Sequence, residues 1–158
     1  MFMDKLNFSK NLIKGRVAEM IFEQMLRDAG GFTVLGFGYE KIIPELARRQ
    51  NTIEAERTME IIRRAPDFAV IRHETNKVYL VEVKYMHNMT REKVLMAAEK
   101  MINSWDPSYL FIVTPHSFYF ESVRSIVEKS GQIEAFGYDA VSSELQNKYL
   151  KLLNTFLT

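Results

Sequence analysis

Apolar positions along the chain recur with two spacings, and each change of spacing predicts a change between helix and strand. From Ser9 to Ala29 the apolar residues recur every three or four positions. This predicts a helix with Ser9 as its N-cap and Gly30-Gly31 as its stop. The following stretch, FTVLGFGYEKII (residues 32–43), predicts a strand. Two glycines within it, Gly36 and Gly38, indicate a bulge or the close approach of another backbone.

The next segment is charged and leads into a pattern typical of a β-hairpin. Residues 44–64 begin with Pro44. Their sequence predicts a short helix capped at Asn51 or Thr52. Two apolar runs around a polar turn then follow, in RRAPDFAVIRHETNKVYLVEVKYM (residues 63–86). Period-two alternation in both runs predicts paired antiparallel strands.

The second half of the chain predicts three helices and one more strand. Thr90 caps a helix over Arg91–Trp105, and YLFIVT (residues 109–114) is a short buried strand. A helix is expected from Ser117 to Ser130, ended by Gly131. The last helix, Ser143–Leu157, opens with a Ser-x-x-Gln pattern typical of a capping box. Its apolar stripe packs on its own sheet or forms the seam of a homodimer.

The predicted order is helix, three strands, helix, strand and two further helices. This alternation favours an α/β fold in which one sheet is covered by helices. No repeat, low-complexity segment or linker interrupts it, so residues 1–158 are expected to form a single domain.

Composition narrows the class of protein. The chain is 47% hydrophobic and 26% charged, which is typical of a folded domain. No apolar run approaches the roughly 18–20 residues that span a bilayer, and the N-terminus lacks the apolar segment of a secretory signal. The absence of cysteine excludes disulfides and thiolate metal sites. We therefore expect a cytoplasmic protein with no membrane partner.

The formal net charge is only +1, but basic residues gather in the N-terminal half. A nucleic-acid surface is therefore expected there rather than in the slightly acidic C-terminal part. Glutamates are interleaved with the arginines before the hairpin, so a solvated helix face with i,i+4 ion pairs is the alternative. The candidates for contacts with backbone phosphates are Lys14, Arg16, Arg63 and Arg64.

Charged residues interrupt the apolar hairpin. Side chains alternate along a strand, so Glu82 and Lys84 share the face opposite Val81 and Val83. A turn centred on Thr75-Asn76 pairs Asp67 with Lys84 and places all three charged groups on one surface. A slip of one residue would send Asp67 to the other face. The alternative interpretation is a half-buried salt-bridge cluster.

The first helix adds a fourth group. On a helical wheel Glu19 falls inside the apolar arc, close to its polar edge. A carboxylate on the core side of a helix is costly unless a cation lies nearby. Gly15, one turn earlier, leaves room for a backbone or a substrate. The alternative for Glu19 is an ordinary surface ion pair.

These residues resemble the motifs of the PD-(D/E)XK nuclease superfamily: Glu19 in the first helix, then Pro66-Asp67, fourteen residues, and Glu82-Val83-Lys84. The predicted order of elements from residue 9 to residue 114 is similar to the αβββαβ core of that superfamily. The resemblance implies a restriction-endonuclease-like α/β fold with a mixed central sheet flanked by helices. It covers roughly two thirds of the chain and leaves the charged insertion and the extra C-terminal helices unexplained.

Hard carboxylate oxygens such as those of Asp67 and Glu82 suit Mg²⁺ or Mn²⁺, which can activate a water for attack on a phosphodiester. The resemblance implies that the backbone carbonyl of Val83 also faces the metal. It further implies that Lys84 orients the attacking water or contacts the scissile phosphate. Glu19 would then bind a second metal directly or through water. The expected function is a Mg²⁺-dependent nuclease that hydrolyses DNA.

Two rival interpretations remain open. A non-catalytic module that binds nucleic acid or assembles with partners could keep the same fold. In an interaction protein the charged cluster would be only a salt-bridge network. His87, Lys93 and Lys100 are expected to be loop or solvated surface residues.

Overall fold

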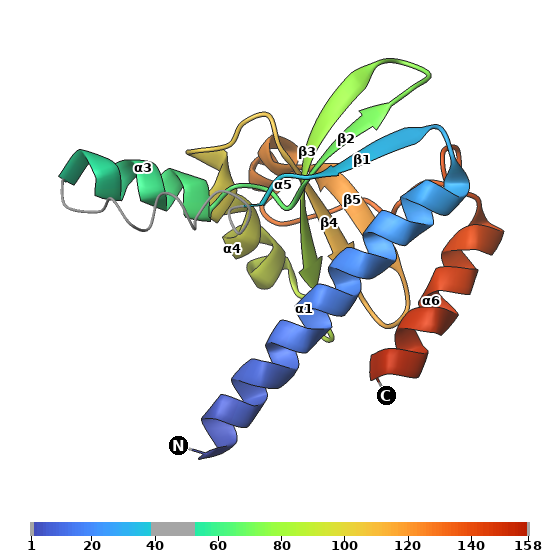
Figure 1. Ribbon diagram of the computed structural model, residues 1–158, viewed down its shortest axis with the longest axis horizontal. Coiled ribbons are helices and arrows are strands. Elements are labelled where there is room, and N and C mark those ends of the chain that lie inside the picture. Colours follow the sequence, from blue (N-terminus) through green and yellow to red (C-terminus); the bar gives the residue numbers. More distant parts are fainter. Residues whose placement is uncertain (1, 39–52, 158) are drawn as a thin grey trace.

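The computed structural model describes residues 2–38 and 53–157 and has an α/β fold, in which five strands form one mixed sheet flanked by helices (Figure 1). The elements are α1 (Phe2–Ala29), β1 (Phe32–Gly36), α3 (Ile53–Arg63), β2 (Phe68–Arg72), β3 (Lys77–Tyr85), α4 (Arg91–Ile102), β4 (Tyr109–Val113), β5 (Phe118–Ser122), α5 (Val123–Glu128) and α6 (Ser143–Leu157).

The strands lie in the sheet in chain order, β1-β2-β3-β4-β5. β3 and β4 are parallel, and the other three neighbouring pairs are antiparallel. Parallel neighbours need a crossover connection, and α4 supplies it between β3 and β4. The expected mixed sheet flanked by helices is therefore confirmed.

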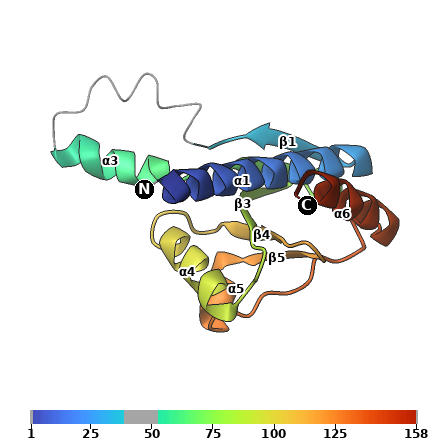
Figure 2. The same cartoon turned by 90° about the horizontal axis from the view of Figure 1, so that it is seen from below.

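Each face of the sheet carries its own helices. Figure 2 shows α1 and α6 on one side of the sheet and α4 and α5 on the other. Two buried clusters match these layers. The larger one packs α1 and α6 against the sheet, and the smaller one packs α4 and α5 around Leu110 and Ile112 of β4.

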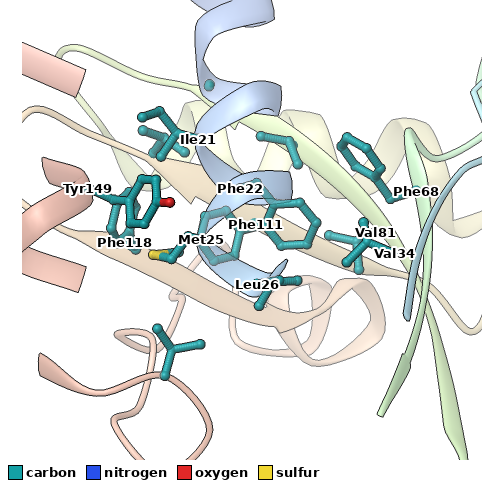
Figure 3. Close-up of a cluster of buried hydrophobic side chains, with 14 of the residues drawn as sticks. Ile21, Phe22, Met25, Leu26, Val34, Phe68, Val81, Phe111, Phe118 and Tyr149 are labelled. Atoms are coloured by element: carbon teal, nitrogen blue, oxygen red, sulfur yellow. The ribbon is translucent and has the colours of Figure 1, made fainter. Parts of the chain in front are cut away.

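The core under α1 is built around aromatic rings (Figure 3). Phe111 of β4 is fully buried, and its ring lies 4.7 Å from that of Phe22 and 5.6 Å from that of Phe118 between ring centroids. Burial of such rings dominates the energy of a core. The C-terminal half of α1 is therefore fixed across the sheet by Ile21, Phe22, Met25 and Leu26.

The N-terminal part differs in its boundaries from the sequence prediction. α1 begins at Phe2, so Ser9 lies inside the helix and is not its N-cap, and Leu12, expected in the apolar arc, is 54% exposed. Although α1 has 28 residues, no helix in residues 2–38 and 53–157 has the length and apolar character needed to cross a membrane.

The first strand is shorter than the strand predicted over residues 32–43. β1 stops at Gly36, and the second half of the predicted strand, residues 39–43, lies outside the described residues. The predicted caps Asn51 and Thr52 lie outside them as well, while the short helix expected in this region is α3.

The hairpin turn covers four residues, 73–76, instead of being centred on Thr75-Asn76. Phe68 pairs with Val81 and Ala69 with Leu80. The predicted pairing of Asp67 with Lys84 is therefore wrong by two residues, because the turn begins earlier than expected. A shift of two residues preserves the face of every side chain, so the predicted common surface survives.

The helix predicted over Ser117–Ser130 is wrong in its first part. Residues 118–122 form β5, which pairs with β4, and only residues 123–128 are helical. Alternating Phe118 and Phe120 favour a strand against the aromatic core. The predicted stop at Gly131 agrees with its φ of +95°, and a Cβ there would lie 2.2 Å from the carbonyl oxygen of Arg91.

The predicted range of α6 is confirmed, but its capping box is wrong. Ser142 is the cap, because its Oγ accepts from the N–H of Leu145. The amide of Gln146 instead donates to the carbonyls of Gly137 and Val141. Tyr149 and Leu153 are buried against the helix's own chain, as the first alternative predicted, whereas Phe156 is 67% exposed.

We predict that Phe111→Ala lowers the free energy of unfolding by about 3–5 kcal/mol, because it opens a cavity among rings that cannot close over it. Urea unfolding followed by circular dichroism measures this loss. Phe156→Ala is the matched control and should cost less than about 1 kcal/mol, because its ring is largely in solvent. Equal losses in the two variants would contradict the assignment of the core.

Candidate functional site

The hairpin places Glu82 and Lys84 on the face of the sheet opposite the valines that pack under α1. Val81 and Val83 are buried beneath α1 at 1% and 5% exposure. Glu82 and Lys84 alternate with them and therefore point to the face covered by α4 and α5. Asp67 directly precedes β2, and continuing the β2–β3 register by one residue places it opposite Glu82.

Asp67 is held by hydrogen bonds from the segment that follows β1 and from β3. Its backbone carbonyl accepts from the N–H groups of Phe37 and Gly38, at 2.8 and 3.1 Å. Its Oδ2 accepts from the N–H of Val83 at 2.9 Å. The predicted close backbone approach at Gly38 is thus observed, and Asp67 is fixed while its second carboxylate oxygen, Oδ1, makes no such backbone bond among the residues described.

Glu19 joins this cluster from α1. Its side chain is 24% exposed and lies 3.2 Å from Arg16, so the surface ion pair considered for it is present. It nevertheless faces the hairpin as well: Glu19, Asp67, Glu82 and Lys84 all line one cleft of about 800 Å³. Gly15 has open space where a Cβ would stand, so no backbone of another described segment approaches it.

Burial and mutual repulsion hold protons on two of the carboxyls. Burial, together with the neighbouring charge of Asp67, raises the pKa of Glu82 to about 9. The same two causes raise the pKa of Glu19 to about 7, although Arg16 opposes the shift. The three carboxyls therefore crowd one another in a partly buried place, where the charged forms of Glu82 and Glu19 are disfavoured.

The cation nearest Glu82 is Lys84, whose Nζ lies 3.8 Å from Oε1. That side chain is 50% exposed, so the pair is a weak one. This contact is part of the salt-bridge alternative, but it does not offset the effects of burial and of Asp67, which together raise the pKa of Glu82. A divalent cation at this place would favour the charged form of the carboxyls.

The donor set fits a hard cation that keeps most of its own water. Asp67 and Glu82 offer carboxylate oxygens on a shared face, and Mg²⁺ commonly takes one or two carboxylates and fills its other positions with water or phosphate. Within residues 2–38 and 53–157, no three acidic, histidine or cysteine side chains form a ready metal cage. Binding would therefore depend on water and on substrate oxygens.

The cleft also gathers cations, including two that the sequence prediction missed. Arg16, Arg63 and Arg64 line it as predicted, whereas Lys14 is not in the lining and lies 5.8 Å from the ring centre of Tyr85. Lys93 and Lys100, expected to be simply solvated, line the cleft from α4. Their seven-residue spacing places them on one helix face, but the sequence does not reveal that this face borders the hairpin.

The histidines stay outside this cluster. His87 is exposed and its Nδ1 lies 3.4 Å from the hydroxyl of Tyr85. His73 contacts the hydroxyl of Thr33 at 2.7 Å. Neither histidine lines the cleft.

Comparisons of the chain with models of protein families, with curated proteins and with solved structures found no match. The chemistry of the site therefore rests on its own residues.

We predict that the metal-free protein loses stability as the pH rises from about 4.5 to about 9. The raised pKa of Glu82 and of Glu19 means that the folded protein keeps protons that the unfolded chain has already released in this window. The contribution of these two groups is therefore fully present below the unfolded value of 4.5 and is lost as the pH rises through the folded values of about 7 and about 9. Urea unfolding in a chelator, at several pH values, measures the loss.

Glu82→Gln should remove most of this loss, which the rise of the Glu82 pKa from 4.5 to about 9 puts on the order of 6 kcal/mol, because its amide carries no titrating proton. The exposed Glu144→Gln serves as a control and should keep the wild-type slope. Stability of the wild type that rises with pH across the window would contradict the arrangement of the cluster.

Proposed function

We propose that the protein is a metal-dependent nuclease of the PD-(D/E)XK type, with a restriction-endonuclease-like core, that hydrolyses DNA. One observation carries the proposal: Glu19, Asp67, Glu82 and Lys84 come from two separate parts of the chain and line the same cleft. The element order from α1 to β4, with α3 as an insertion, agrees with this interpretation.

Each residue has a role that its position supports. Asp67 and Glu82 would hold Mg²⁺ or Mn²⁺, and Asp67 is suited to this because three backbone N–H groups fix it. When bound, such an ion lowers the pKa of a water and offsets the charge of a phosphate. Lys84 is half exposed beside Glu82 and can orient the attacking water or contact the scissile phosphate.

Glu19 and the backbone of Val83 have supporting roles. Val83 follows Glu82 and donates its N–H to Asp67, so this residue couples the two carboxylates. Its carbonyl is the further metal ligand that the resemblance implies. Burial and the nearby charge of Asp67 raise the pKa of Glu19, so Glu19 lies close to Asp67. From there it can hold a second cation directly, or a water bound to the first cation.

The charge of the cleft supports a polyanionic substrate. Among the described residues, six basic side chains (Arg16, Arg63, Arg64, Lys84, Lys93, Lys100) and four acidic ones (Glu19, Glu23, Asp67, Glu82) line it, a formal charge of +2 in a chain whose total is +1. The rest of the chain is therefore slightly negative. A cleft with this local field attracts phosphates, and any metal bound there strengthens the attraction.

We predict that the protein cleaves labelled DNA in the presence of Mg²⁺ or Mn²⁺ and that a chelator stops the reaction. Asp67→Asn and Lys84→Met should each lower the cleavage rate by at least about a hundredfold, since loss of a group that acts on the reacting atoms typically costs factors of this size. Gel analysis of timed reactions measures the rates, and labelled RNA of the same sequence tests the preference for DNA.

Lys151→Met, an exposed lysine on α6 away from the cleft, is the control and should cleave like the wild type. Circular dichroism must show that all three variants are folded. Cleavage that persists in both Asp67→Asn and Lys84→Met would overturn the mechanism. Binding of nucleic acid without any cleavage would favour the alternative of a non-catalytic binding module.

A further inference from the structure

The wall of the cleft formed by α4 is not explained by the catalytic groups. Lys93, Met96, Ala97 and Lys100 line the cleft with the i, i+3, i+4, i+7 spacing of one helix face. The other side of α4 carries Val94 and Ala98, which are buried in the smaller core cluster. The packing of α4 thus points a lysine-bearing face at the cleft.

Lys93 and Lys100 are spaced along α4 so that each can contact a different phosphate. Seven residues correspond to about 10.5 Å along a helix, so Lys93 and Lys100 lie about two turns apart on the same face. The Nζ of Lys93 donates to the backbone carbonyl of Asn88 at 2.9 Å, which tethers it without neutralising its charge. Lys100 has no ion pair with any residue in the described parts of the chain.

Arg63 and Arg64, at the end of α3 and just after it, add to the positive field of the cleft. The guanidinium of Arg63 lies 3.1 Å from Glu60, and that of Arg64 lies 4.0 Å from the same carboxylate. Two arginines therefore share one negative charge and leave an excess of positive charge. Both are also exposed at the cleft.

The lining offers little that could read base edges. Sequence-specific contacts are made by arginine or lysine to guanine, by Asn or Gln amides to adenine, by carboxylates to cytosine and by hydroxyls, and base stacking needs exposed aromatic rings. In the described lining there is no Asn, Gln, Ser, Thr, Tyr or Trp, and its single aromatic residue, Phe68, is only 7% exposed. All three arginines of the lining already contact a carboxylate.

Two exposed methionines also line the cleft. Met20 and Met96 are 64% and 58% exposed in the cleft. Their flexible thioether side chains adapt to many shapes and carry no strong hydrogen-bonding group. They can contact a base or a sugar without distinguishing one base from another.

We infer that the cleft binds nucleic acid through its phosphate backbone without reading base sequence, and that Lys93 and Lys100 of α4 bind the phosphates. This inference rests on the proposed function for the identity of the ligand. It names two residues and a mode of recognition that the catalytic cluster does not require. The sugar and bases then pass over Met20 and Met96.

The test measures binding in an Asp67→Asn background, which should stop cleavage while the amide oxygen of the new side chain can still accept from the N–H of Val83. Two labelled duplexes of equal length and unrelated sequence, and their separated strands, are titrated at several salt concentrations. The Asp67→Asn protein without further changes should bind both sequences with dissociation constants within about threefold. Its affinity should fall steeply with salt, because each phosphate contact releases counterions.

Adding Lys93→Gln and Lys100→Gln should weaken binding about tenfold or more, equally for both sequences. The slope of log K against log [salt] should decrease by about 2 for the duplex, or about 1.4 for single strands, as expected for two lost phosphate contacts. Lys151→Gln, at an exposed position on α6, should change neither quantity.

Three results would overturn the inference: an unchanged salt slope in the Lys93→Gln/Lys100→Gln variant, a hundredfold preference for one sequence, or no binding to either form of nucleic acid. The first two leave the proposed hydrolysis intact if the wild type cleaves DNA. Conversely, the predicted slopes in a protein that never cleaves would refute the hydrolysis and leave the binding mode standing.

Discussion

Alternation along β3 is the constraint on which the site depends. Val81 and Val83 must be buried under α1, so Glu82 and Lys84 are forced onto the other face of the sheet. The aromatic packing of Phe111 against Phe22 fixes α1 above these valines. The carboxyl of Glu82 is thereby held where burial makes its charge costly.

The cost is concentrated at one point. Asp67, Glu82 and Glu19 crowd together while Lys84 and Arg16 supply only partial compensation. Strongly perturbed carboxyls in a cleft are typical of functional sites, although structural ion-pair networks produce them too. The cations of α3 and α4 surround this acidic centre, an arrangement suited to a metal ion at the centre and phosphates around it. Charging these partly buried carboxyls costs free energy, and a bound cation would lower that cost.

Much of this could be predicted from the sequence, and the failures have physical reasons. Alternation places Glu82 and Lys84 on one face, and Asp67 joins them in any register that is wrong by an even number of residues, so the error of two residues left the common face unchanged. That register depended on where the hairpin turn begins, which local residue preferences do not decide. The strand at Phe118–Ser122 was missed because its partner, β4, is what stabilises it. Lys93 and Lys100 were not predicted to line the cleft, because their position there depends on how α4 packs against the sheet, which is a tertiary property.

The most direct test of a metal site at Asp67 and Glu82 is a calorimetric titration of Mn²⁺ into the wild type and into the Asp67→Asn/Glu82→Gln double variant. We predict a saturable binding heat in the wild type that disappears in the folded double variant. The titration is repeated with nucleic acid present, because substrate phosphates can complete the coordination of the ion. Equal heats in the two proteins, or no heat in the wild type under either condition, would contradict the metal site.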